Sequence, residues 1–137
     1  MKKSHIWDVT EIKYNKKGNL VHFKDIKNGS PVEIRYRYDE NNNLIYRDNN
    51  GFKLWFKYDK NNNLIYKKNS NNDKFLYEYD ENNNCIHSTN IEANCESIYE
   101  EMRNKKYEVW SKYDKNNNLI YTINSYGTEK WYKNRDI

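Results

Sequence analysis

Several residue types on which many folds and functional sites depend are scarce in this chain. Its 137 residues include only 4 Gly, 1 Pro, 2 Cys and 2 Met. So little glycine leaves scant material for a glycine-rich loop around phosphate groups, and no such motif occurs. The two cysteines, Cys85 and Cys95, cannot supply the disulfide framework of a small secreted domain, so a reducing, cytoplasmic location is expected.

Long apolar runs are missing as well. The mean hydropathy is −1.33, and no segment approaches the roughly 20 apolar residues that cross a bilayer as a helix. No apolar run follows Met1, Lys2 and Lys3, so neither a signal peptide nor a membrane association is expected. The net charge of +4 comes from 24 basic and 20 acidic side chains that interleave. A dedicated binder of double-stranded nucleic acid would more often show one clustered basic face.

Aromatic residues, in contrast, are abundant. The chain has 14 Tyr and 4 Trp, whereas disordered chains are poor in aromatics. Amphipathic rings can cover a thin sheet while their polar groups stay in water. One domain over residues 1–137, with a shallow core rich in tyrosine, is therefore expected.

One short segment recurs along the chain. It reads YDENNNLIY at Tyr38–Tyr46, and copies run over Tyr58–Tyr66, Tyr79–His87 and Tyr113–Tyr121, with a looser copy at Tyr14–His22. A recurring segment of this kind indicates stacked copies of one supersecondary unit. The repeats start at residues 14, 38, 58, 79 and 113, and the longest interval contains an insertion at 89–106.

Each repeat has the pattern of a β-hairpin, and its turn can be derived. Asp39 suits the first position of a type I turn, and the residue three positions later must adopt a positive φ. That position is Gly18 in the first copy and Asn in the others, the side chain that best tolerates this conformation. The sequence therefore predicts a type I turn followed by a bulged residue. Asn28-Gly29 and Asn50-Gly51 indicate tight turns at the opposite ends of the hairpins.

The strands that lead into these turns alternate. Ile34, Tyr36 and Tyr38 share one face, and Arg35 lies on the other. After the turn, Leu44 and Tyr46 are expected on one side of the sheet and Ile45 on the other.

The insertion has a different period. Ile91, Cys95, Ile98 and Met102 recur at helical spacing, and Thr89 with Glu92 forms a capping-box pattern. An α-helix near residues 90–104 is therefore expected. The alternative is an extra hairpin in which Ile98-Tyr99 pairs with Tyr107–Val109.

No catalytic or metal site is expected. Asp39-x-Asn41-x-Asn43 resembles the start of a calcium loop, but Leu44 stands where that loop needs Gly and Asn50 where it needs a bidentate Glu. His22 and His87 occupy a position that is Tyr in the other repeats, so we interpret them as aromatic packing residues. No nucleophile–base or metal-ligand spacing appears. We expect a protein that is not an enzyme and has no cofactor.

The Tyr-Asp pair, followed by a turn with Gly or Asn and then Leu-Ile, resembles the YD repeats of Rhs and teneurin-type proteins. The resemblance extends from about Tyr14 to Lys133. It implies hairpins that join edge to edge in a spiralling shell and supplies no catalytic residues, because the repeats are scaffold. With about five repeats, this chain is expected to form a mainly β fold, a curved antiparallel meander in a single domain.

The face opposite the tyrosines carries the sharpest functional signal. Trp, Tyr and Arg dominate binding hot spots, and the alternative is a packing face covered by the insertion or by a partner subunit. The candidate interface residues are Arg35, Trp55, Lys57, Leu76, Trp110, Lys112, Trp131 and Lys133. They favour a non-catalytic protein-binding module. By analogy of size and composition, it would be a small phage or mobile-element inhibitor that occludes a host defence enzyme, as anti-CRISPR proteins do, or a toxin-immunity protein.

Two other functions stay open. Exposed aromatics and lysines could bind single-stranded nucleic acid, although glutamates on the same face argue against it. The chain could also be a structural, Rhs-like scaffold fragment that self-associates as a homodimer through its sheet edges.

Overall fold

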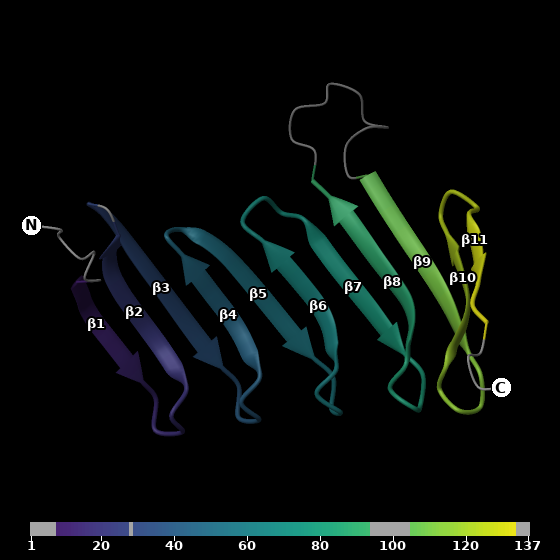
Figure 1. Cartoon of the computed structure of the whole chain (residues 1–137), viewed down its shortest axis with the longest axis horizontal. Coiled ribbons are helices and arrows are strands. Elements are labelled where there is room, and N and C mark those ends of the chain that lie inside the picture. Colours follow the sequence, from purple (N-terminus) through teal and green to yellow (C-terminus); the bar gives the residue numbers. More distant parts are fainter. Residues whose placement is uncertain (1–7, 28, 94–104, 134–137) are drawn as a thin grey trace, which may run out of the picture. The chain divides into compact units, whose positions relative to one another are not determined.

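The fold is mainly β and consists of antiparallel strands in one open meander. A computed structural model describes residues 8–27, 29–93 and 105–133, and these ranges contain strands and no helix. The strands follow one another across the sheet in chain order (Figure 1). Short connections join them, except between β8 and β9, where residues 94–104 lie outside the described residues. They are β1 (Asp8–Tyr14), β2 (Leu20–Lys27), β3 (Ser30–Tyr38), β4 (Leu44–Asn49), β5 (Phe52–Tyr58), β6 (Leu64–Asn69), β7 (Lys74–Tyr79), β8 (Cys85–Glu92), β9 (Lys105–Tyr113), β10 (Leu119–Asn124) and β11 (Glu129–Trp131).

The chain divides into two compact units, Met1–Phe56 and Lys57–Ile137. The boundary falls within β5, so unit one contains β1 to β4 and unit two contains β6 to β11. The predicted mainly β meander of hairpin repeats is confirmed. The single domain and its curvature stay predictions.

The turn inside each repeat is built as the sequence predicts. The amide of Asn42 donates to the carbonyl of Asp39 at 3.2 Å, which closes a type I turn, and Asn42 has a φ of 64°. The Asp39 carboxylate accepts the amides of Asn41 and Asn43 at 2.9 and 2.8 Å. Gly18 has a φ of 83° at the matching position of the first repeat. The alternation of Asn and Gly at this position is therefore a consequence of the left-handed backbone.

A register shift follows the turn. In the second repeat Arg37 faces Tyr46 and Tyr38 faces Leu44, which leaves Ile45 as the extra residue of a β-bulge. Shifts at the same place occur between β1 and β2, β7 and β8, and β9 and β10. Because Arg37 and Tyr38 lie on opposite faces, Leu44 and Tyr46 lie on opposite faces too. The expectation that they share a side is wrong.

The tyrosines that open the second, fourth and fifth repeats are each hydrogen-bonded to the preceding repeat. The Tyr38 hydroxyl donates to the carbonyl of Leu20 at 2.9 Å, and Tyr79 donates to Leu64 at 2.7 Å. Burial raises the pKa of both hydroxyls. The Tyr-Asp pair thus has two roles, since Tyr joins successive hairpins and Asp holds its own turn.

The sheet buries little. Among the residues whose side chains are described, no hydrophobic side chain is fully buried, and only Asp25 and Thr89 are, at 0% and 8% exposure. The tyrosine face is half-buried by its own neighbours, as the burial of Tyr36, Phe56 and Tyr77 shows. This agrees with a shallow, tyrosine-rich core spread along a sheet, which leaves both faces accessible.

The insertion differs from the prediction. Thr89 and Glu92, the expected capping box, lie in β8, so the helix predicted near residues 90–104 is wrong at its N-terminal end. The alternative hairpin is wrong as well, because Tyr107 and Val109 face Asn90 and Ser88. Residues 94–104, including Cys95, Ile98 and Met102, lie outside the described residues. On both sides of residues 94–104, pairing with neighbouring strands determines the conformation, and the helical spacing of the sequence does not.

Acid should weaken the hairpins. Despite the opposing effect of desolvation, the backbone amides of Asn63 and Asn84 hold the pKa values of Asp59 and Asp80 below their usual range. A carboxyl whose pKa falls on folding stabilises the fold above its unfolded pKa of about 3.9, and this stabilisation is lost as pH falls through the folded pKa. Urea unfolding between about pH 5 and pH 2.5 should show this loss.

The variant Asp59→Asn/Asp80→Asn should show a shallower dependence on pH over the same range. The control variant Glu81→Gln removes a carboxyl from the middle of the same turn and should keep the wild-type slope. An unchanged slope in the double Asp variant would contradict the role assigned to these turn carboxylates.

Candidate protein-binding surface

Within each unit, the register places predicted interface residues on one face of the strands. In unit one, Trp55 faces Tyr46 and Arg35 faces Asp48, which puts Arg35 and Trp55 on the same side. In unit two, Leu76 faces Tyr66 and Trp110 faces His87. We call this side of unit two the tryptophan face. Strand register, or a contact with an aromatic ring, assigns the following residues to this face: Lys57, Tyr66, Leu76, His87, Trp110, Lys112, Tyr121 and Trp131.

Two residues stand apart from this group. Arg35 is on the corresponding side of unit one, where its guanidinium binds Glu33 at 2.7 Å. Lys133 is exposed and follows the end of β11, so strand register does not assign it to a face.

Aromatic side chains pair across neighbouring strands of the tryptophan face. The rings of His87 and Trp110 stack at 5.0 Å with an interplanar angle of 7°, and those of Tyr121 and Trp131 lie 4.4 Å apart. The Lys112 ammonium lies 5.4 Å from the centre of the Tyr121 ring. Such pairs hold large side chains in place at the surface. Trp110 remains 41% exposed and Trp131 73% exposed, so both offer area for contact.

The partners of these tryptophans were missed in the sequence. His87 and Tyr121 were assigned to packing positions, and the stack of His87 on Trp110 confirms an aromatic role for that histidine. What the sequence did not indicate is that His87 and Tyr121 lie on the same face as the tryptophans. A bulge moves every following side chain to the other side. The positive φ predicted at Asn83 and Asn117 was therefore a usable signal, because it implied the bulge.

Charged groups around His87 satisfy one another. Its ring nitrogens lie 3.2 Å from Glu108 and 3.4 Å from Glu78, and the Lys106 ammonium binds Glu108 at 3.2 Å. Desolvation works to raise the pKa of Glu108, but the hydrogen bonds from Lys106 and His87 outweigh it and hold the pKa below its usual range. In this arrangement the carboxylates hold His87 in place, and the Thr89 hydroxyl lies 3.4 Å from its Nε2 atom.

The polar residues that could hold a metal are engaged elsewhere. The carboxylates of Asp39 and Asp59 accept turn amides, as do those of Asp80 and Asp114. Over the described ranges, no group of three or more His, Cys, Asp and Glu side chains is placed to bind a metal ion. Nor does the same part of the chain contain a helix of the length and hydrophobicity that a bilayer crossing needs.

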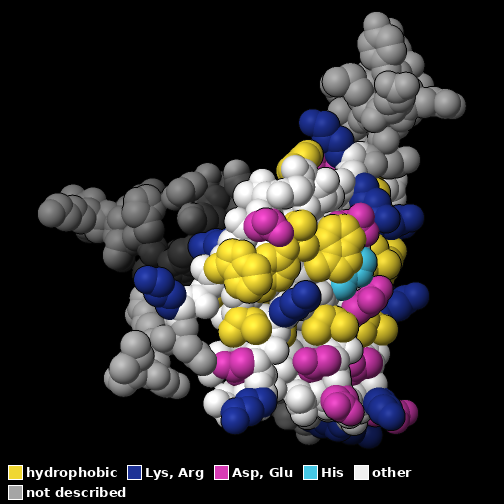
Figure 2. Space-filling view, turned by 90° about the vertical axis from the view of Figure 1, so that its right-hand side faces the viewer, with side chains coloured by type: hydrophobic (Ala, Val, Ile, Leu, Met, Phe, Trp, Pro, Cys, Tyr) yellow, Lys and Arg dark blue, Asp and Glu magenta, His cyan; other side chains and the backbone are white. Residues whose placement is uncertain are grey.

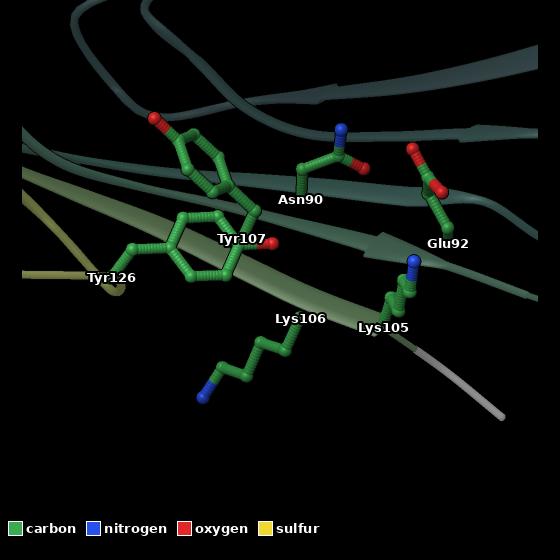
Figure 3. A pocket seen from close by; sticks show the side chains of 6 residues that line it. All are labelled: Asn90, Glu92, Lys105, Lys106, Tyr107 and Tyr126. Atoms are coloured by element: carbon green, nitrogen blue, oxygen red, sulfur yellow. The ribbon is translucent and has the colours of Figure 1, made fainter. Parts of the chain in front are cut away.

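A shallow hollow of 290 Å³ lies near the junction of β8, β9 and the turn after β10. The rings of Tyr107 and Tyr126 lie side by side there, 5.7 Å apart, while Lys106 points away from them (Figure 3). The side-chain oxygen of Asn90 is buried without a hydrogen-bond partner in the described structure. Glu92 faces Lys105 across the two strands. This hollow is on the opposite face from Trp110.

Hydrophobic and charged side chains are intermixed at the end of unit two formed by β10 and β11. Figure 2 views this end and shows hydrophobic side chains gathered as a group, with Lys, Arg, Asp and Glu around and between them. Protein-binding surfaces likewise combine hydrophobic and polar side chains.

Comparison with known proteins yields a similarity of fold. No family model and no curated protein matches the sequence. The structure is similar to part of a chain in the crystal structure described as TcdB2-TccC3-Cdc42, with a TM-score of 0.65 and 19% sequence identity. The match covers 85% of this chain and 7% of that one. The hairpin-repeat sheet is therefore a fold shared with a small portion of a much longer chain.

Proposed function

We propose that the chain is a non-catalytic protein-binding module and that the tryptophan face of unit two is its binding surface. The observation that carries this proposal is the exposure of Trp110 and Trp131 while each is held by a ring on the next strand. Ordered, exposed tryptophans lose little side-chain entropy on binding and are the residues most enriched in hot spots. The surrounding carboxylates and lysines supply the polar rim.

The partner proposed from the sequence is a host defence enzyme or a toxin, which the module would occlude. Occluding a partner requires a stable binding surface but no catalysis. A repeat sheet with an aromatic face provides such a surface. A second candidate is a Rhs-like scaffold role, which the similarity to part of a toxin-complex chain favours. In that case the tryptophan face would pack against another part of a larger assembly.

Removing the two tryptophans should reduce partner binding about tenfold or more, since truncated hot-spot residues commonly cost this much. The immobilised full chain is incubated with host lysate, retained proteins are identified by mass spectrometry, and the affinity of the partner is then measured with the purified protein. The variant Trp110→Ala/Trp131→Ala is compared with Tyr107→Ala/Tyr126→Ala, which removes two exposed aromatics near the hollow on the opposite face.

Equal losses in the two variants would contradict a binding role for the tryptophan face, as would a wild-type chain that retains no protein. A chain that retains only copies of itself, through an edge that the tryptophan variant leaves intact, would favour the scaffold role. The mass of the complex in solution separates these outcomes.

A further inference from the structure

The tight turn between β4 and β5 contains Asn50-Gly51, and in Asn-Gly pairs the side-chain amide of asparagine is readily hydrolysed. Asn49 faces Phe52 across this turn, and the two residues between them have φ values of 50° and 92°. Positive φ at both central residues defines a type I′ turn. Both central residues are exposed, so water reaches them. The turn therefore brings a chemically reactive pair to the surface of unit one.

Deamidation of an Asn-Gly pair starts within the backbone. The Gly51 nitrogen attacks Cγ of Asn50, and the N–H proton leaves with the side-chain nitrogen as ammonia. The product is a five-membered succinimide ring. Water then opens the ring at one of its two carbonyl carbons, which gives aspartate or isoaspartate at position 50. The overall change replaces an amide NH2 by OH and consumes only water.

The folded turn keeps the two reacting atoms apart. Type I′ is the mirror image of type I, so ψ of its first central residue is about +30°. At this ψ the Gly51 nitrogen lies nearly opposite to Cβ of Asn50 about the Cα–C bond. Closure of the succinimide ring requires both atoms on the same side of that bond. The turn must therefore open before the reaction can start.

Hydrogen bonds to two different strands hold this conformation. The Asn50 side-chain oxygen accepts the Glu33 amide at 2.6 Å, and its nitrogen donates to the carbonyl of Pro31 at 3.4 Å, which holds the side chain at β3. The Gly51 amide, which supplies the attacking nitrogen, donates to the Asp48 carboxylate of β4 at 2.8 Å. The two groups that would react are thus bonded to separate partners.

A matching link in unit two lacks the reactive pair. There the Glu108 amide donates to the Ser125 hydroxyl at 3.1 Å, and the Ser125 amide donates to the Glu108 carbonyl at 2.9 Å. Asn50 makes the same backbone bond to the Glu33 carbonyl at 2.9 Å. Because serine has no amide to hydrolyse, the link in unit two is not subject to this reaction.

We infer that Asn50-Gly51 is a modification site, a deamidation site that the folded turn protects and that opening of the turn makes reactive. The site is in unit one and does not depend on the binding function proposed for unit two. Isoaspartate adds one atom to the backbone between β4 and β5, so the two-residue turn that pairs Asp48 with Lys53 cannot re-form. The reaction thus makes a transient opening of this hairpin permanent.

Peptide mapping of the full chain measures the reaction. Trypsin releases the peptide 48–53, which contains Asn50 and is separate from the other Asn-Gly pair at Asn28. The wild-type chain is incubated at mildly alkaline pH, folded or in guanidinium chloride, and digested at intervals. Deamidation at Asn50 should be about tenfold or more slower in the folded chain, because the reaction requires local opening.

One variant tests the restraint on the attacking nitrogen. Asp48→Ala removes the acceptor of the Gly51 amide and should raise the rate in the folded chain about fivefold. Dividing each folded rate by that of the same variant in guanidinium chloride removes the direct effect of the side chain on the chemistry. The control Glu40→Gln removes a carboxyl from the turn at the other end of β4 and should stay within about twofold of the wild type. Urea unfolding confirms that both variants are folded.

Three results would overturn the inference. Equal rates in the folded and unfolded wild-type chain would show that the turn gives no protection, and this comparison needs no variant. An unchanged or slower reaction in folded Asp48→Ala would show that the carboxylate does not restrain the Gly51 nitrogen. Unchanged amide hydrogen exchange in β4 and β5 after conversion to isoaspartate would show that the hairpin re-forms. Faster exchange there is the expected result.

Discussion

Replacing Tyr113 by alanine should lower the free energy of unfolding of unit two by about 3 kcal/mol, because the change removes both a half-buried ring and a hydrogen bond. The Tyr113 hydroxyl donates to the carbonyl of Cys85 in the preceding repeat at 2.9 Å, and burial raises its pKa. Because no hydrophobic side chain is buried in the described part of the chain, the sheet there depends on such links between hairpins. Urea unfolding measures the total loss, and amide hydrogen exchange shows whether β9 and β10 open first.

Two further variants show how much of this loss of stability comes from the hydroxyl and how much from the buried ring. Tyr113→Phe keeps the ring and loses only the hydroxyl, so it should cost about 1 kcal/mol. Tyr126→Ala removes a tyrosine that is 77% exposed and should stay within about 0.5 kcal/mol of the wild type. Equal stabilities of Tyr113→Ala and Tyr126→Ala would show that the tyrosine of the Tyr-Asp pair does not join the repeats.

The part of the fold that the sequence predicts well is local. A left-handed residue must be Gly or a tolerant side chain such as Asn, and three residues before it stands an Asp or Asn whose side-chain oxygen accepts the turn amides. The hairpins can therefore be predicted from Gly18, Asn42 and their counterparts without knowledge of any distant contact. The same turn recurs in every repeat, so each strand pairs with the next one in the chain. The order of the strands in the sheet follows from this.

The insertion shows where local reasoning is insufficient. Thr89 has a polar side chain suited to a helix cap, yet it is among the most buried residues of the sheet and lies between Leu76 and Glu108. Its neighbours on both strands are distant in sequence, so no window around Thr89 contains the pairing that decides its conformation. A helical period over few turns cannot be distinguished from a strand by spacing alone.

The candidate site depends on register and was therefore only partly predictable. Trp110 and Lys112 could be placed on one face by counting along their own strand. The stack of Trp110 on His87 requires the alignment of neighbouring strands, which the bulges shift by one residue. Charge counting gave interleaved signs, and only the pairing of β6 with β7 brings Lys68 and Lys74 face to face.

Valine at Asn117 should destabilise unit two by about 2 kcal/mol, because a β-branched side chain is strained at a positive φ. Asn117 has a φ of 65°, and its amide closes the turn on Asp114 at 3.0 Å. Its side-chain oxygen also accepts from Asn84 of the preceding repeat at 2.9 Å. Asn117→Gly removes the same side-chain bond without strain, so comparison of the two variants by urea unfolding isolates the backbone contribution.

The neighbouring residue supplies a stricter control. Asn116 is in the same turn but has no positive φ, so Asn116→Val should change stability by no more than about 0.5 kcal/mol. A left-handed backbone at Asn117 thus requires three ranked stabilities, with Asn117→Val well below Asn117→Gly and Asn116→Val near the wild type. If valine is tolerated equally at both positions, the turn is not the type I turn with a bulge that sets the register. In that case, the assignment of His87 and Trp110 to one face loses its basis.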